Sequence, residues 1–474
     1  MEQTLLGIAQ KINAYLSDYI LIVLLIGVGL FYSIRTRFVQ IRCFGEGMKR
    51  TFGGIFAKKE KNKISSYGAL ATAIAAQVGT GNIVGASGAI LLGGPGAIFW
   101  MWIIAFFGMA TIYSEAVLAQ ETKVKGDDGV FKGGPVYYIK KAFTGKFGTF
   151  LAAFFAVAVV LALGFMGSMV QLNSIAESAN KAFGIDTWIV GLVVTLICAL
   201  IYLGGAKRIV SVAEKIVPVM AVLYIVGGLI VLGVRYKYLP ETFSMIFKYA
   251  FTPDAMIGGG IGYALKTAIS QGAKRGLFSN EAGMGSTPHA HALADVKKPH
   301  DQGVVAMIGV FVDTFVVLNI TAFVVISTLY AGNGPLGAIA GENYVADIAT
   351  TGLAKTNMMQ EAYHIAFPNL PRAFGDGFVS ICLLFFAFTT IIGWNLFGKI
   401  NFEHLFGKKS LVVYFVVALV FTFMGSVIQN DLAWELTDMF NNLMVIPNVI
   451  ALFALSGMVV KNVKSAKQGD RLDG

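Results

Sequence analysis

The sequence predicts an all-α polytopic membrane protein, and three observations indicate that class: the composition, the long apolar segments and the glycine-rich interruptions. Of the 474 residues, 56% are hydrophobic and only 14% are charged, which is too apolar for a soluble globular chain. A spanning helix needs about 20 predominantly apolar residues, so we expect eleven transmembrane helices. Their predicted ranges are 19–36, 65–92, 97–120, 147–178, 186–205, 211–234, 256–292, 302–331, 374–402, 410–428 and 432–460.

The first 18 residues carry apolar side chains at helical spacing, among them Leu5, Ile12 and Leu16. This pattern predicts a short amphipathic helix that lies in the membrane interface. No basic segment precedes the first span and no small-residue cleavage site follows it, so we expect that span to be retained. The three cysteines lie in or beside different spans and predict no disulfide framework.

The net charge of +10 is explained by membrane topology, because the basic residues alternate from loop to loop. Residues 35–63 carry nine Lys and Arg residues and residues 123–146 carry six, whereas the long loop 332–373 holds only Lys355 and Arg372. Basic loops are retained in the cytoplasm, so the N-terminus is predicted outside and the C-terminus inside the cell membrane. The expected partner is the lipid bilayer; no nucleic acid and no obligate protein partner are indicated.

After the first span, the ten remaining spans divide into two sets of five. An interrupted segment leads each set, 65–92 in the first and 256–292 in the second, and the two enter the membrane from opposite sides. That placement predicts an inverted-topology repeat. The predicted units are an N-terminal part at 1–63, repeats at 64–240 and 241–462, and a cytoplasmic tail at 463–474.

The first interruption contains Gly79, Thr80, Gly81 and Asn82 in the middle of an apolar segment. Irregular backbone at membrane depth persists only where it is buried in protein or lines a wet cavity. Unwinding at the glycines would free carbonyls on one half-helix, which suit a cation, and N–H groups on the other, which suit an anion. A zwitterion such as an amino acid, together with a monovalent cation, fits this juxtaposition.

The second interruption is predicted at Gln271-Gly272-Ala273-Lys274-Arg275-Gly276. Paired interruptions in the two halves of a membrane chain indicate the binding site of a secondary transporter. Lys274 and Arg275 have an alternative interpretation, because the two cations could belong to a cytoplasm-facing gate.

Several polar positions have structural interpretations that stay open. Gly81-x-x-x-Gly85 is also a helix-packing motif, and Gln171 suits an interhelical hydrogen bond. Thr389 and Thr390 offer adjacent hydroxyls to a cation, or bond back to their own helix. Asp313 is a charge at membrane depth, which indicates function or, alternatively, a structural ion pair or a helix-anchoring bond. Its possible partners are Lys266, Lys274, Arg275, Glu281 and Glu115.

Four motifs resemble one known family. They are Gln77-Val78-Gly79-Thr80-Gly81-Asn82-Ile83-Val84-Gly85, Gly93-Gly94-Pro95-Gly96-Ala97-Ile98-Phe99-Trp100-Met101-Trp102, Gly133-Gly134-Pro135-Val136-Tyr137-Tyr138 and Phe278-Ser279-Asn280-Glu281-Ala282-Gly283-Met284-Gly285-Ser286. In order and spacing they are similar to the alanine/glycine:cation symporter family, the sodium:alanine symporters.

The resemblance implies a LeuT-type fold with one extra helix before a ten-helix core, and a transporter rather than an enzyme. It implies import of small neutral amino acids such as alanine and glycine, driven by sodium through alternating access. Sodium would be held by carbonyls of Ala75 and Val78 with the hydroxyls of Thr389 and Thr390. The substrate would contact Gly79, Thr80, Gly81, Asn82, Gln171 and the segment Gln271 to Gly276, with Phe165, Met166 and Phe278 closing a small pocket.

Three rival functions are considered. In the first, protons replace sodium and Asp313 or Glu281 carries them. In the second, the chain is an intramembrane serine protease, because Gly85-Ala86-Ser87-Gly88 matches a short serine motif and His289 and His291 lie on another span; this requires a histidine within hydrogen-bond reach of the serine. The third is a channel, but no filter-like sequence is present.

Overall fold

The computed structural model describes residues 2–55, 63–126, 129–251, 261–337, 351–428 and 430–469, and these are almost entirely helical. Parts of four predicted features lie outside the described residues: 56–62 of the basic loop, 256–260 of the seventh span, 338–350 of the long loop and 470–474 of the tail.

The first half of the chain carries one small hairpin, in which strand β1 (Val124–Lys125) pairs antiparallel with β2 (Phe131–Lys132). Its helices, in chain order, are α1 Glu2–Tyr15, η1 Leu16–Leu21, α2 Ile22–Arg35, α3 Val39–Arg42, α4 Phe44–Ile55, α5 Ser66–Gln77, η2 Gly81–Gly85, α6 Ala86–Gly93, α7 Ala97–Thr122, α8 Pro135–Ala142, α9 Gly145–Val159, η3 Val160–Gly167, α10 Ser168–Phe183, α11 Thr187–Tyr202, α12 Gly205–Val234 and η4 Tyr236–Tyr238.

The second half is described as helices and connecting segments. Its helices are α13 Leu239–Phe251, α14 Ile261–Asn280, α15 Pro288–Ala292, α16 Pro299–Val310, η6 Phe311–Leu318, α17 Asn319–Val325, η7 Ile326–Tyr330, α19 Met358–Ala366, α20 Arg372–Phe406, η8 Lys408–Ser410, α21 Leu411–Met424, α22 Asn430–Ala454 and α23 Ser456–Gly469.

Seven helices in the described part are long and apolar enough to cross a membrane, or eight if the bent pair α5 and η2–α6 counts as one span. The chain is therefore a multi-pass, mostly helical membrane protein. Three further predicted spans coincide with α11, with α14 and α15, and with α21, which do not meet that test. The total of eleven stays a prediction.

The N-terminal segment differs from the prediction. α1, η1 and α2 follow one another without a break, and 3–35 forms one apolar helical run of 33 residues. No boundary separates an amphipathic helix over 1–18 from the span. The reason is local: no glycine or proline lies between Leu16 and Ile26 to end the helix.

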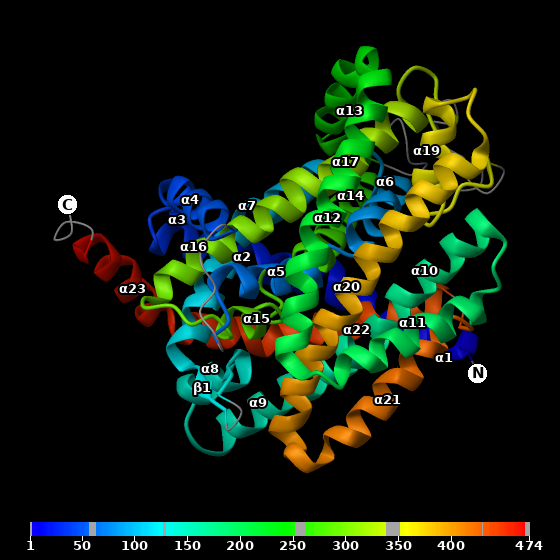
Figure 1. Cartoon of the computed structure of the whole chain (residues 1–474). Coiled ribbons are helices and arrows are strands. Elements are labelled where there is room, and N and C mark those ends of the chain that lie inside the picture. Colours follow the sequence, from blue (N-terminus) through cyan, green and yellow to red (C-terminus); the bar gives the residue numbers. More distant parts are fainter. Residues whose placement is uncertain are drawn as a thin grey trace.

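Two long helices organise the packing around the predicted site. α20 packs on α5, α10 and α12, while α7 packs on α2, α14 and α16. α13 and α19 lie at one end of the molecule, at the top of Figure 1, and the β hairpin with α8 lies towards the opposite end. The interrupted helices lie against these long helices, α5 against α20 and α14 against α7, and α14 also packs on α6.

Candidate functional site

The first predicted interruption is confirmed. α5 ends at Gln77 and the helix resumes at Gly81, with a bend of 48° between the two pieces. A Cβ placed on Gly79 would lie 2.4 Å from the Thr390 hydroxyl oxygen and 3.0 Å from Gln171 Oε1. Glycine is needed here because side chains from α20 and α10 approach the backbone closely.

The predicted position of the second interruption is wrong. α14 is helical through Gln271 to Gly276 and continues to Asn280. Gly272 serves helix packing, because a Cβ there would lie 2.6 Å from the Cβ of Trp100 on α7. The side chain of Gln271 lies beside Gly93, at the end of α6 and away from the first break.

The helix actually breaks at residues 281–287, before α15 begins at Pro288. Glu281, Gly283 and Gly285 have φ angles of 57°, 88° and 82°. A left-handed conformation at three alternate positions ends a helix. The break therefore lies inside the fourth sequence motif, which already carried two glycines within three residues.

The two breaks touch each other. Gln77 Nε2 donates a hydrogen bond of 2.6 Å to the carbonyl of Asn280, the last residue of α14. A Cβ on Gly81 would lie 3.1 Å from the Phe278 ring and from the Ser279 Cα. The end of α14 thus forms one wall of the first break.

Asn82 joins the first break to the helix η6. Its Oδ1 accepts the N–H of Gly79 at 3.0 Å, and its Nδ2 donates to Asp313 Oδ1 at 2.7 Å. Asp313 Oδ2 accepts from Ser279 at 2.9 Å and from Thr314 at 3.0 Å. The carboxylate on η6 therefore ties the first break to the end of α14, which leads into the second break.

Of the two structural interpretations of Asp313, its described contacts match the helix-anchoring bond and not the ion pair. Lys266 instead contacts Tyr19, with 3.1 Å between Nζ and the hydroxyl, and Lys274 and Arg275 pair with Asp438. Asp313 is stabilised by neutral hydrogen-bond donors, which is how a buried carboxylate avoids the cost of desolvation.

The adjacent threonines of α20 point in different directions. Thr390 Oγ1 lies 3.0 Å from the carbonyl oxygen of Ala75 and 3.5 Å from that of Val78. Both hydroxyls also bond back to their own helix, Thr389 Oγ1 to the carbonyls of Phe385 and Phe386 and Thr390 Oγ1 to that of Phe386 at 3.0 Å. The structure brings Thr390 to the predicted cation-binding carbonyls and leaves Thr389 outside them.

Buried side-chain atoms without a hydrogen-bond partner lie together at the first break. Gln77 Oε1, Thr80 Oγ1 and Gln171 Nε2 are buried and have no hydrogen-bond partner within the described ranges. Gln171 Oε1 accepts the N–H of Thr80 at 3.1 Å, which fixes the amide and directs Nε2 elsewhere. Each unsatisfied buried group costs about 1–3 kcal/mol, so the cluster indicates a ligand site.

The two predicted pocket aromatics have different environments. The Phe278 ring packs between Trp394, with centroids 5.7 Å apart, and Trp434, at 4.8 Å, next to Gly81. Phe165 stacks on Phe421 and Tyr414 of α21 and is not brought to the break.

Lys274 and Arg275 form a buried ionic cluster with α22. Lys274 Nζ lies 2.9 Å from Asp438 Oδ2, and Arg275 makes two contacts of 3.0 and 3.3 Å to the same carboxylate. Lys355, from the loop after η7, shares the Trp434 ring with Arg275. The basic-residue pattern predicts that this loop lies outside, whereas the gate is predicted to face the cytoplasm; the two predictions do not agree, and both stay predictions.

The second break is held by buried polar side chains. Glu281 accepts from Trp394 Nε1 at 2.5 Å and from the Ser286 hydroxyl. Glu115 of α7 accepts the N–H of Gly283 at 3.1 Å and Asn448 Nδ2 at 2.6 Å. These bonds pair buried backbone and side-chain groups that unwinding would otherwise leave without a partner.

Comparison with known proteins identifies the chain. The model of the sodium:alanine symporter family matches residues 2–471. The chain belongs to the sodium:alanine symporter family.

Relatives in this family include proteins with named activities. The sodium/alanine symporter AgcS of Methanococcus maripaludis is 38% identical, covering 97% of this chain and 96% of the relative. The putative sodium/proton-dependent alanine carrier protein YrbD of Bacillus subtilis is 40% identical, covering 94% of this chain and 89% of the relative. The probable sodium/glutamine symporter GlnT of Bacillus subtilis is 39% identical over 98% and 91%.

Solved structures are similar at a lower level. A Na+-coupled sialic acid symporter is 12% identical with a TM-score of 0.46, covering 95% of this chain and 85% of that one. An Eremococcus coleocola manganese transporter is 12% identical with a TM-score of 0.49, over 84% and 79%. TM-scores below 0.5 do not establish a shared fold.

Membership of a symporter family leaves the protease alternative without support, and the geometry agrees. His289 bonds to the Ser286 carbonyl and to Asn401, and His291 bonds to Gln302. The described hydrogen bonds include none between either histidine and Ser87. A histidine that does not reach the serine cannot activate it.

Sequence reasoning missed several residues that complete the site: Ser279, Asn280, Thr314, Thr321 and Trp434. Thr321 donates to the carbonyl of Asn82 at 2.6 Å, and Asn280 donates to Thr314 at 3.3 Å. Ser279 and Asn280 belong to the fourth motif, so that motif carried a signal. The others come from segments whose approach to the break no local pattern predicts.

Proposed function

We propose that the protein imports small neutral amino acids, of the alanine and glycine class, together with sodium. The observation that carries this proposal is the first break, where unpaired buried polar atoms lie near the Ala75 and Val78 carbonyls that the Thr390 hydroxyl contacts. We further propose the LeuT-type architecture of eleven helices, with two inverted five-helix repeats after the first span.

The substrate carboxylate is proposed to bind Gln171 Nε2 and Thr80 Oγ1, the two unpaired donors. Both lie where η2 begins, and the N-terminal end of a helix carries partial positive charge. Gly79 and Gly81 allow the substrate to approach the backbone. Phe278 beside Gly81 limits the side-chain volume, which favours alanine or glycine over larger residues.

Sodium is proposed as the co-transported ion, bound by the carbonyls of Ala75 and Val78 and the Thr390 hydroxyl. Oxygen ligands suit a hard cation, and the hydroxyl already lies within 3.0 and 3.5 Å of the two carbonyl oxygens. The name of the Methanococcus maripaludis relative, a sodium/alanine symporter, supports both the ion and the substrate.

Coupling follows from the shared break. Sodium on one half-helix and the amino acid on the other stabilise the same local arrangement, so each raises the affinity for the other. The bundle that carries the breaks would then rock against the remaining helices. The cluster of Lys274, Arg275 and Asp438 is proposed as the outer gate, in a cell-membrane protein with its N-terminus outside.

The experiment is alanine uptake into proteoliposomes under an imposed inward sodium gradient, with potassium as the control. The matched variants are Thr390→Ala and Thr389→Ala, which remove the same atoms from adjacent positions. We expect Thr390→Ala to raise the sodium concentration for half-maximal uptake by about tenfold, the cost of one charge-assisted contact. Thr389→Ala should stay within about twofold of wild type.

Two results would contradict the sodium assignment. One is uptake that proceeds equally in sodium and potassium. The other is an equal effect of both threonine substitutions, which would point to helix stability rather than to an ion contact.

Proton coupling is the second candidate, and a specific observation favours it. Glu115, Glu281 and Asp313 are fully buried, and their described contacts are hydrogen bonds rather than ion pairs. A relative is named a putative sodium/proton-dependent alanine carrier. Uptake driven by a proton gradient without sodium, and lost in Asp313→Asn or Glu281→Gln, would establish this candidate instead.

A further inference from the structure

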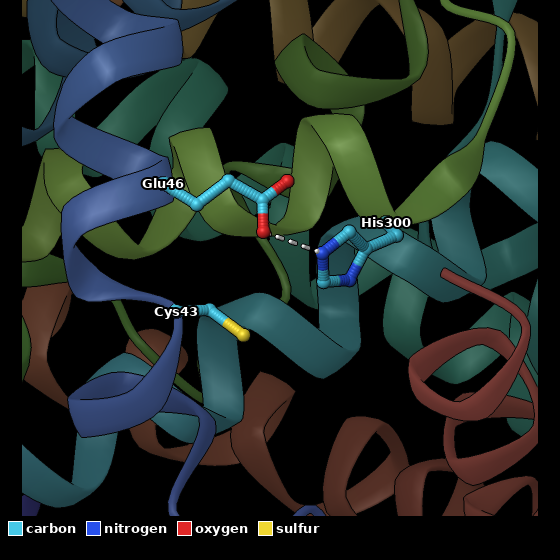
Figure 2. A group of neighbouring side chains, drawn as sticks. All are labelled: Cys43, Glu46 and His300. Atoms are coloured by element: carbon cyan, nitrogen blue, oxygen red, sulfur yellow. Dashed lines mark hydrogen bonds and ion pairs between the residues drawn. The ribbon is translucent and has the colours of Figure 1, made fainter. Parts of the chain in front are cut away.

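Three side chains with metal-binding atoms meet at the start of α16, away from the first break. Cys43 precedes α4, Glu46 lies in the first turn of α4, and His300 lies in the first turn of α16. Their sulfur, carboxylate oxygen and ring nitrogen all lie within 4.8 Å of one another. Figure 2 shows the three side chains pointing toward one another, with Glu46 and His300 in contact.

The imidazole of His300 is held in one orientation. Its Nδ1 lies 2.7 Å from the Tyr113 hydroxyl of α7, and the residue is 5% exposed. The opposite nitrogen, Nε2, then faces Glu46 Oε2 at 3.3 Å. A metal-binding histidine characteristically uses one nitrogen for the metal while a neighbouring polar group holds the other.

Glu46 is held in a similar way from its far side. Its Oε1 accepts from Arg50 Nε at 2.8 Å, while Oε2 is directed at His300. Arg50 also contacts Asp301 on α16 at 3.1 Å. The helices are in close contact, since a Cβ on Gly47 would lie 2.8 Å from the carbonyl oxygen of Val304.

We propose that Cys43, Glu46 and His300 bind a divalent cation of the Zn²⁺ class. Thiolate, imidazole and carboxylate together are a zinc ligand set, and Cys43 is not part of a disulfide. Metal–ligand distances of about 2.0–2.1 Å in a tetrahedron place nitrogen and oxygen ligands about 3.4 Å apart. The observed separation of Nε2 and Oε2 is 3.3 Å.

Three protein ligands leave one position for water, as in an open zinc site. The ion would connect α4 to α16, whose continuation η6 carries Asp313. This inference does not rest on the proposed transport function, because the site shares no residue with the first break.

The test measures Zn²⁺ binding to the purified full-length protein in detergent micelles, by competition with a chromophoric chelator. We expect one ion per chain, and an affinity at least about tenfold weaker in Cys43→Ser and in His300→Gln. With Co²⁺ in place of Zn²⁺, the wild type should show a sulfur-to-metal charge-transfer band that Cys43→Ser lacks.

Two further variants separate ligation from folding. Cys382→Ser changes a buried cysteine of α20 outside the group and should bind Zn²⁺ like the wild type. Tyr113→Phe keeps all three ligands but releases His300, and should weaken binding by about 10- to 100-fold. No stoichiometric binding in the wild type, or unchanged binding in Cys43→Ser, would overturn the proposal. Binding is measured without transport, so failed uptake leaves this result intact.

Discussion

The two helix breaks lie in contact but differ in how their polar groups are satisfied. At the first break, polar atoms of Gln77, Thr80 and Gln171 have no partner in the described structure. At the second, Glu281 accepts hydrogen bonds from Ser286 and Trp394, and Glu115 accepts them from the N–H of Gly283 and from Asn448. Within 281–287, Thr287 Oγ1 is the one buried side-chain atom without a partner.

The difference separates two uses of the same sequence signal. Unpaired buried groups raise the free energy of an interruption when no ligand is bound. A ligand that pairs with them would therefore stabilise that conformation. An interruption whose groups are already paired is a rigid turn, and it acts by positioning the end of α14 against the first break. Both contain glycines, so the glycines alone do not distinguish the two roles.

The largest expected effect comes from Asn82→Ala, which removes bonds on both sides of the first break. The N–H of Gly79 and the carboxylate of Asp313 each lose a partner, at roughly 1–3 kcal/mol per group. We expect the ratio of maximal uptake rate to half-saturating alanine concentration to fall about 100-fold. Asn180→Ala, at an exposed position on α10, is the control. An Asn82→Ala protein with normal uptake would contradict the central role of this break.

Gly79→Ala should have the next largest effect. The added Cβ meets Thr390 Oγ1 at 2.4 Å and Gln171 Oε1 at 3.0 Å, which displaces the residues proposed for sodium and for the substrate. Overpacking of about 1–3 kcal/mol predicts a loss of uptake of about 10- to 100-fold. Gly27→Ala on α2 is the matched control, because nothing lies within 4 Å of its Cβ. Equal uptake in the two variants would refute the close approach.

Glu281→Gln should change stability more than transport. The amide keeps one acceptor and loses the other, which leaves Trp394 or Ser286 unpaired at a cost of about 1–3 kcal/mol. Thermal unfolding, followed by tryptophan fluorescence, should shift down by a few degrees. The sodium concentration for half-maximal uptake should stay within about twofold, because the first break keeps its groups. Complete loss of uptake in a stable variant would instead favour proton coupling through Glu281.

Gly85→Ala should have the smallest effect, although Gly85 lies in the same motif as Gly79. A Cβ there would meet its nearest atoms, on Arg275 and Thr80, at 3.8 Å, which is ordinary contact. We expect alanine uptake within about twofold of wild type, since the added methyl group fits this buried position without overpacking. Severe loss would revive the helix-packing interpretation of Gly81-x-x-x-Gly85.

The sequence alone determined the class of protein and the place of the first break. Apolar segments of membrane length leave few alternatives to helices, because the bilayer offers backbone groups no other partner. Gly79 and Gly81 marked an interruption because local chemistry decides where a helix unwinds at low steric cost. The family followed from four motifs spread along the chain, without any knowledge of their contacts.

Only the tertiary structure decided what the other glycines and polar residues do. Gly272 permits close packing on Trp100, whereas Gly283 and Gly285 permit a left-handed turn. Because glycine suits both helix packing and helix breaks, the second break was predicted ten residues too early. Thr389 and Thr390 are the same residue type and both bond to their own helix, yet Thr390 also reaches the carbonyls of Ala75 and Val78, whereas Thr389 lies against Met220. These outcomes depend on which helix lies opposite, and that is a property of packing between segments far apart in the chain.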